Sequence, residues 1–269
     1  MTHSRPTVRE LLTSRGLAPR RDLGQNFVAD PNTVRRIAHL AGVGPDDHVV
    51  EIGAGLGSLT LALAETGAAI TAVEVDRGLV AALREVVADV PAVRVVEADA
   101  MTLDWDELLA GAPGWVLVAN LPYNVATPLV CDLLDDVPAI GRMLVLVQKE
   151  VAERLAAPAG SVAYGAVSVK VAYWATARTV GDVPASVFMP RPKVESALVE
   201  IVRRTPPAVR SDDLVPLVRT AFGQRRKMLR RSLADVVTAE QFVAADVPET
   251  ARPEELALDD WVRLTEAVG

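Results

Sequence analysis

The chain has 269 residues, of which 50% are hydrophobic and 23% charged, a globular balance that excludes disordered and fibrous classes. Its length suits one large domain or two modest ones. The net charge of −7 argues at first against a nucleic-acid partner, because phosphate binding depends on lysine and arginine.

Three further features of the sequence exclude other classes of protein. Although the mean hydropathy is +0.24, proline and glycine interrupt the longest uncharged run, residues 108–131, so no membrane-spanning helix is expected there. The N-terminus is arginine-rich without an apolar segment, which excludes a secretory signal. A single cysteine, Cys131, excludes a disulfide framework and a thiolate-rich metal site. We therefore expect a cytoplasmic protein that binds no metal.

From residue 48 onward, short β-rich runs alternate with amphipathic stretches at helical spacing. Strands are predicted at 48–52, 69–75, 92–97, 114–119 and 142–147, with helices at 59–65, 78–88 and 127–134. Near-continuous Val, Ile and Leu strands predict a mostly parallel sheet covered on both faces. Two more β-like runs follow at 171–180 and 194–202, the second alternating as in an antiparallel edge hairpin.

The pattern changes at Thr205-Pro206-Pro207, beyond which the chain is predicted to be wholly helical. The expected helices are 212–222, 225–237, 239–245 and 259–267, the last with Asp259 as N-cap. The sequence thus predicts an α/β domain over 1–205 and a small helical domain over 206–269.

A glycine-rich turn, Glu51-Ile-Gly53-Ala-Gly55-Leu-Gly57, ends the first of these strands. The next two strands end in Glu74-Val-Asp76 and Glu97-Ala-Asp99-Ala100, which brings carboxylates to the edge of the sheet where ligands bind in open α/β folds. The spacing G-x-G-x-G differs from the pyrophosphate-binding G-x-G-x-x-G. S-adenosylmethionine therefore fits better than NAD, and the alternative is a plain α/β fold with capping residues.

The fourth strand ends in Asn120-Leu121-Pro122-Tyr123, the most specific short motif of the chain. The Asn120 side-chain oxygen and the Leu121 backbone carbonyl can accept from the amine of an adenine, since Pro122 keeps the preceding residue extended. Tyr123 offers a face for stacking the base. The alternative is an ordinary turn at the end of a strand.

With these motifs the chain resembles the KsgA-type ribosomal RNA adenine N6,N6-dimethyltransferases from about residue 20 to its end. It also carries Gly24-Gln25-Asn26-Phe27, and Phe188-Met-Pro190-Arg-Pro192-Lys-Val194-Glu-Ser196, which matches F-x-P-x-P-x-V-x-S. The resemblance implies a Rossmann-like class I S-adenosylmethionine-dependent methyltransferase domain with a seven-stranded sheet, followed by a helical domain.

The resemblance also implies site residues. It assigns Glu74 to the cofactor ribose, Asp99 to the cofactor adenine, and Phe188 to a second aromatic face opposite Tyr123. Position 28 is usually leucine in the family and is Val28 here. The cofactor-binding candidates are Gln25, Asn26, Val28, Glu51, Gly53, Gly55, Glu74, Asp99, Ala100 and Asn120; the catalytic candidates are Asn120, Leu121, Pro122, Tyr123 and Phe188. Without the resemblance, residues 24–27 would be a turn and Phe188 a core residue.

The segment Arg225-Arg226-Lys227-Met228-Leu229-Arg230-Arg231 has five positive charges and no acids. We interpret it as a phosphate-contacting element rather than a solvated helix face. Residues 232–269 hold nine acidic and two basic side chains, so the net charge belongs to this tail, and the objection to RNA is withdrawn. The arginine-rich segment 5–21 is either a second RNA contact or a mobile tail.

The resemblance implies direct methyl transfer to N6 of two adjacent adenosines in a hairpin loop near the 3′ end of 16S rRNA. The expected partner is this RNA within an immature small subunit, and the expected state is a monomer with no membrane contact. Two alternatives stay open: an Erm-type 23S rRNA methyltransferase and an assembly factor that mainly binds. Methylation of DNA is disfavoured because nothing resembles a domain that recognises duplex DNA.

Overall fold

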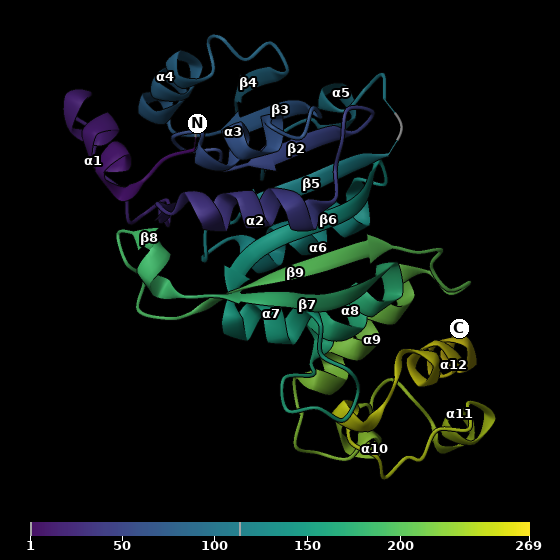
Figure 1. Cartoon of the computed structure of the whole chain (residues 1–269). Helices are drawn as coiled ribbons and strands as arrows, with labels where there is room; N and C mark the ends of the chain where they lie inside the picture. The colour runs from purple at the N-terminus through teal and green to yellow at the C-terminus, as the bar shows by residue number, and fades with distance from the viewer. Residues whose placement is uncertain (1, 113) are drawn as a thin grey trace. The chain divides into compact units, whose positions relative to one another are not determined.

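The computed structural model describes residues 2–112 and 114–269 and contains a seven-stranded mixed sheet of order β4-β3-β2-β5-β6-β9-β7 (Figure 1). Strands β4 to β6 along this order are parallel to one another, and β9 is antiparallel to β6. The strands are β2 (His48–Ile52), β3 (Ala69–Glu74), β4 (Val93–Glu97), β5 (Trp115–Asn120), β6 (Ile140–Gln148), β7 (Ala175–Val183) and β9 (Ser196–Arg203). The mostly parallel α/β fold predicted from the sequence is confirmed.

Helices connect the parallel strands and bury apolar side chains against them. Polar caps fix where two of them begin: Asp30 accepts from the Thr33 amide at the start of α2, and Asp76 accepts from the Gly78 amide at the start of α4. In Figure 1, α2 crosses the near face of the sheet. The helices are α2 (Pro31–Ala41), α3 (Ser58–Ala64), α4 (Arg77–Val86), α5 (Trp105–Leu108), α6 (Ala126–Asp136) and α7 (Lys149–Leu155).

The N-terminal segment is folded, which corrects the alternative of a mobile tail. Residues Arg5–Ser14 form α1, which lies beside α4 (Figure 1) and buries Val8 and Leu12 in a cluster with Leu79. The Arg5 guanidinium donates to the Phe188 carbonyl at 3.0 Å. A two-stranded sheet of β1 (Phe27–Val28) and β8 (Phe188–Met189), the latter preceded by the short helix η1 (Ala185–Val187), joins the N-terminal segment to the loop before β9.

Two strand predictions are wrong in part. The run 171–180 begins inside a helix, α8 (Ala166–Trp174), and only β7 from Ala175 is extended. This helix is buried on several sides, so its β-branched and aromatic residues show no helical period. Strand β9 is interior rather than at the edge, since it lies between β6 and β7. Its first four residues are all buried for that reason.

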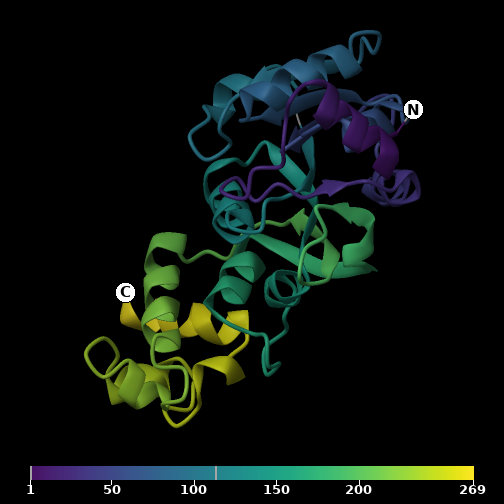
Figure 2. The same ribbon diagram turned by 90° about the vertical axis from the view of Figure 1, so that its left-hand side faces the viewer.

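The chain divides into two compact units: the described residues up to 152 with 179–202, and residues 153–178 with 203–269. The second unit therefore includes residues 153–178, which the predicted boundary at 205 assigns to the α/β domain. Its helices, clustered in the green-to-yellow part of Figure 2, surround a core that contains Leu214, Phe242 and Trp261. They are α8, α9 (Ser211–Phe222), α10 (Leu229–Ser232), α11 (Ala239–Ala244), η2 (Pro253–Glu255) and α12 (Leu258–Val268).

Two details of this unit differ from the sequence prediction. The helix expected over 225–237 shrinks to α10, because the amides of Leu229 and Arg230 donate to Ala251 and Glu249 across the fold instead of along a helix. Asp259 is not the N-cap of the last helix; Ala257 holds that position, and the Asp260 carboxylate accepts from its amide. Within the described residues, no helix is long and apolar enough to span a membrane.

Candidate active site

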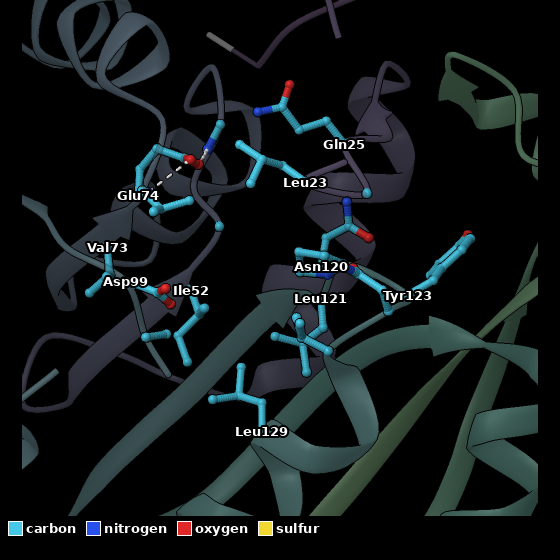
Figure 3. Close-up of a pocket in the computed structure, with 18 of the residues that line it drawn as sticks. Leu23, Gln25, Ile52, Val73, Glu74, Asp99, Asn120, Leu121, Tyr123 and Leu129 are labelled. Carbon is cyan, nitrogen blue, oxygen red and sulfur yellow. Dashed lines mark hydrogen bonds between the residues drawn. The ribbon is translucent and has the colours of Figure 1, made fainter. Parts of the chain in front are cut away.

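A pocket of about 1030 Å³, including its open mouth, lies at the carboxyl ends of β2, β3, β4 and β5 (Figure 3). The N-terminal segment closes one side of it. Eleven residues predicted from the sequence line the pocket: Gln25, Asn26, Gly53, Gly55, Glu74, Asp99, Ala100, Asn120, Leu121, Pro122 and Tyr123. The topology thus gathers motifs that are far apart in the sequence at one edge of the sheet.

The glycine turn and Glu74 form one wall. Gly55 has φ +59°, and a Cβ there would lie 3.1 Å from the Phe27 ring, so only glycine fits without displacement. Its amide donates to the Glu74 carboxylate at 2.8 Å, the contact drawn in Figure 3. The amides of Val75 and Asp76 donate to the other Glu74 oxygen. Burial raises the pKa of Glu74, and these three donors oppose the shift by favouring the carboxylate.

Beside this wall the pocket has an apolar slot with one carboxylate at its rim. Ile52, Val73, Leu121 and Leu129 line the slot, and Asp99 stands at its edge (Figure 3). Asp99 is held in place because its carboxylate accepts from the Met101 amide at 2.9 Å. An apolar slot beside one carboxylate, with a buried second carboxylate nearby, can accommodate a nucleoside, because aliphatic side chains pack against a base and carboxylates accept from ribose hydroxyls.

Asn120 has a fixed amide orientation. Its Nδ2 donates to the backbone carbonyl of Asn26 at 2.8 Å, so its Oδ1 is left as an acceptor. In Figure 3 this oxygen lies on the side of Tyr123. The Leu121 amide donates to the Leu146 carbonyl in β6 at 3.1 Å, which ties the loop to the sheet. The loop therefore presents an oriented hydrogen-bond acceptor at the pocket.

Tyr123 and the segment around Gly24 complete this side of the pocket. The half-buried Tyr123 side chain has a pKa raised by burial, and its hydroxyl lies 2.6 Å from the Ser196 hydroxyl. Gly24, at φ +63°, approaches the loop so closely that a Cβ would lie 2.8 Å from the Asn124 Oδ1 and 3.2 Å from the Pro122 Cβ. The segment Gly24-Gln25-Asn26-Phe27, here called the N-terminal motif, is thus in direct contact with the segment Asn120-Leu121-Pro122-Tyr123, here called the reactive loop.

Three predicted site residues do not line the pocket. Phe188 is wholly buried in the core and pairs with Val28 across the β1–β8 sheet; its assignment as a second aromatic face stays a prediction. Val28, its partner in that pairing, is also buried. Glu51 lies inside β2, where it accepts from the Thr60 hydroxyl at 2.6 Å, and burial raises its pKa to about 8. Val28 and Glu51 instead line a smaller adjoining cavity.

The basic segment lies in the second unit, and its cations fall into two groups. Arg230 pairs with Glu249 at 3.0 Å, and Arg225 lies 3.8 Å from Glu254 while donating to the Val162 carbonyl. The other cations make no ion pair among the described residues and are exposed: Arg226, Lys227 and Arg231. Two of the five charges are therefore partly neutralised in place.

Sequence reasoning missed one partner in the site. Ser196 belongs to the F-x-P-x-P-x-V-x-S motif, but a serine at the start of a strand gives no signal of the side chain it meets. The pocket residues Leu23, Phe27 and Met101 were not predicted either, since apolar residues of this kind read as ordinary core. Among the described residues, no group of three or more His, Cys, Asp or Glu side chains could hold a metal ion.

Comparison with known proteins places the chain. The family model of ribosomal RNA adenine dimethylase matches residues 16–268. The chain is 45% identical to the ribosomal RNA small subunit methyltransferase A of Bifidobacterium adolescentis, over 97% of this chain and 92% of that protein. It is 46% identical to the protein of the same name from Streptomyces avermitilis, with the same shares covered.

Solved structures agree on the fold. The crystal structure of the 23S rRNA methyltransferase ErmE matches with a TM-score of 0.71 at 26% identity, over 90% of this chain and 99% of that one. A dimethyladenosine transferase from Plasmodium falciparum matches with a TM-score of 0.76 at 23% identity, over 87% and 94%. With the family model spanning both units, the chain belongs to the ribosomal RNA adenine dimethylase family.

Proposed function

We propose that the protein transfers methyl groups from S-adenosylmethionine to N6 of two adjacent adenosines in a hairpin loop near the 3′ end of 16S rRNA, giving N6,N6-dimethyladenosine during small-subunit biogenesis. Family membership and relatives named for the small subunit support this reaction. The observation that carries it is the Asn120 amide, fixed by the Asn26 carbonyl beside a pocket shaped for a nucleoside.

The residues present fit the cofactor. Glu74 accepts hydrogen bonds from the ribose hydroxyls, and Asp99 accepts one from the amine of the adenine ring. The ring itself lies in the aliphatic slot. S-adenosylmethionine supplies, when bound, an electrophilic methyl group on a sulfonium. The chain's own part in the reaction is to hold the target amine in line with that methyl group.

Asn120 and Leu121 act on the nucleophile. The lone pair of adenine N6 is delocalised into the ring, so the amine is a poor nucleophile until it rehybridises. The Asn120 Oδ1 and the Leu121 carbonyl accept hydrogen bonds from this amine. They favour the tetrahedral geometry that the nitrogen takes as the new bond forms. The side chains that line the pocket in the described structure include no histidine, and none is needed, because the alkylated nitrogen is acidic enough to lose its proton to water.

Orientation supplies much of the acceleration. Well-aligned groups lower a barrier by about 7–11 kcal/mol relative to reactants free in solution. The target adenine must leave its stack to enter the pocket, and the face of Tyr123 replaces the lost stacking. Two successive transfers require that the same acceptors also hold a monomethylated amine.

The exposed cations of the second unit bind RNA phosphates in this proposal, because Arg226, Lys227 and Arg231 are not neutralised by neighbouring acids. Arg225 and Arg230 chiefly hold the segment in shape. We further propose that the enzyme acts as a monomer in the cytoplasm on an immature small subunit.

The similarity to ErmE makes methylation of 23S rRNA the second candidate. Labelled S-adenosylmethionine, incubated with separated small and large subunits that lack the modification, distinguishes the two. The proposal predicts label in the small-subunit RNA at two adjacent adenosines. Label confined to the large subunit would overturn it.

A further inference from the structure

The Tyr123 hydroxyl has a partner distant in the sequence. Its oxygen lies 2.6 Å from the Ser196 Oγ, and either hydroxyl can donate. Tyr123 ends the reactive loop and lines the pocket, whereas Ser196 is the first residue of β9 and the last of the F-x-P-x-P-x-V-x-S motif. The contact therefore links the two motifs through their terminal residues.

Ser196 is a rigid anchor. Its side chain is completely buried, and its backbone is paired with Gln148 of β6. The same strand β6 accepts the Leu121 amide through Leu146. The hydroxyl of Ser196 and the backbone of the reactive loop are thus both fixed to β6, so their relative position is set by the sheet.

The hydrogen bond restrains the far end of the Tyr123 ring. The loop backbone fixes the near end, and a bond at the hydroxyl then keeps the long axis of the ring from swinging about χ1. Burial raises the pKa of Tyr123, so the hydroxyl stays neutral at physiological pH and can donate to Ser196. A phenylalanine at this position would keep the ring and lose the restraint.

We propose that Ser196 is a positioning residue, whose hydroxyl holds the axis of the Tyr123 ring at the place where the target adenine stacks on it. The proposal rests on the proposed function, which supplies the base that uses this face. Binding is weakened when a side chain must lose its freedom as the base arrives. Because the hydrogen bond already orders the ring, this cost is avoided. Ser196 acts only through Tyr123 and does not touch the reacting atoms.

A first experiment observes the ring directly. The chain has three tyrosines, and the other two donate to backbone carbonyls, Tyr164 to Leu256 and Tyr173 to Val209. Incorporation of 3-fluorotyrosine gives one fluorine resonance for each, and Tyr123→Phe identifies its own by deletion. Ser196→Ala is expected to shift and broaden or narrow the Tyr123 resonance. An unchanged resonance overturns the restraint.

Ser168→Ala is the matched control. Ser168 is as buried as Ser196, and its hydroxyl donates to the Arg154 carbonyl, within the second unit. The Ser168→Ala substitution removes a buried hydroxyl that has no contact with Tyr123. The Tyr123 resonance is expected to stay in place in this variant, and a shift as large as that in Ser196→Ala would mean that any loss of packing moves the ring.

A double-mutant cycle then tests the reaction. Ser196→Ala is expected to lower kcat/KM for unmethylated small subunits by about three- to tenfold, the usual effect of one hydrogen bond, with binding of S-adenosylhomocysteine unchanged. In a Tyr123→Phe background the same substitution is expected to change kcat/KM by less than about twofold, because the bond is already gone. Equal losses in both backgrounds, or no loss in either, overturn the positioning role.

The two proposals fail separately. If the unaltered protein transfers no label to small subunits, the proposed function fails. The fluorine resonance still decides whether Ser196 holds the ring of Tyr123.

Discussion

The Asn120 Nδ2 donates to the backbone carbonyl of Asn26 at 2.8 Å, across 94 residues of sequence. The Asn26 side chain in turn donates from its Nδ2 to the Gly24 carbonyl at 3.0 Å. The N-terminal motif therefore decides which atom of the Asn120 amide meets the substrate. Removal of this chain of contacts should impair the reaction more than it impairs cofactor binding.

Asn120→Ala tests this order of effects. We expect methyl transfer to fall by about 10²- to 10³-fold, as for loss of one hydrogen-bonding group that acts in a transition state. The dissociation constant of S-adenosylhomocysteine, measured by calorimetry, should change only a few-fold.

Asn120→Asp keeps an acceptor but loses the donor to Asn26, so its methyl transfer should also be impaired. Asn32→Ala, on an exposed position of α2, is the control that should retain activity. Turnover of Asn120→Ala within tenfold of the unaltered protein would refute the assignment.

Gly24→Ala tests the contact between the N-terminal motif and the loop. Gly24 and Gly16 both have φ +63°, but a Cβ at Gly24 meets Asn124 and Pro122, whereas at Gly16 nothing lies within 4 Å. Both alanine variants should lose about 1 kcal/mol of stability from backbone strain, and Gly24→Ala should lose more because its Cβ displaces neighbouring atoms. Only Gly24→Ala should lower kcat/KM, by more than about tenfold, because it displaces the loop. Equal activities of the two variants at matched folded fractions would show that the contact does not position the loop.

Glu51→Gln tests the buried carboxyl. Burial raises its pKa to about 8 in the fold, above the 4.5 of an exposed glutamate. Between these values the unfolded chain releases the proton and the folded chain retains it, so stability falls as pH rises through this window and levels off above it. Glutamine does not ionise and can still accept from Thr60. Urea denaturation should therefore show Glu51→Gln gaining stability relative to the unaltered protein from pH 5 to pH 8; a difference independent of pH would contradict the raised pKa.

The division of the basic segment predicts unequal salt effects. We expect replacement of both Arg226 and Lys227 by alanine to weaken the salt dependence of binding to small-subunit RNA. The slope of the logarithm of the association constant against the logarithm of salt concentration should fall by about 1.5, because each lost phosphate contact removes about 0.7–0.9. Replacing Arg225 and Arg230 removes the same formal charge, but these two cations already pair with Glu254 and Glu249. This second double replacement should therefore reduce the slope less. A larger reduction from the paired arginines would reverse the assignment.

Much of the site could be predicted from the sequence because parallel strands deliver their carboxyl ends to one edge. The glycine turn, Glu74, Asp99 and Asn120 each follow a strong strand, so their meeting needs only the strand order. The motif at 24–27 is different: on residues alone it is a turn, and only its resemblance to a family placed it at the pocket.

The failures have physical causes. The buried helix α8 shows no period, because several of its faces are apolar, and its β-branched residues imitate a strand. Phe188 is buried in the core, as the residues alone predict, and its role as an aromatic face, which the resemblance implies, stays a prediction. The contact between Tyr123 and Ser196 joins residues whose closeness depends on the register of β9 with β6, which no local pattern encodes.

Analysis of nucleosides after the reaction shows which atom of which RNA the protein methylates. Unmethylated small subunits are incubated with the protein and S-adenosylmethionine, the RNA is digested, and its nucleosides are identified by mass spectrometry. We expect N6,N6-dimethyladenosine at two adjacent positions near the 3′ end of 16S rRNA, and its loss with Asn120→Ala. Methylation at another atom or in large-subunit RNA alone, or an undiminished yield from Asn120→Ala, would contradict this expectation.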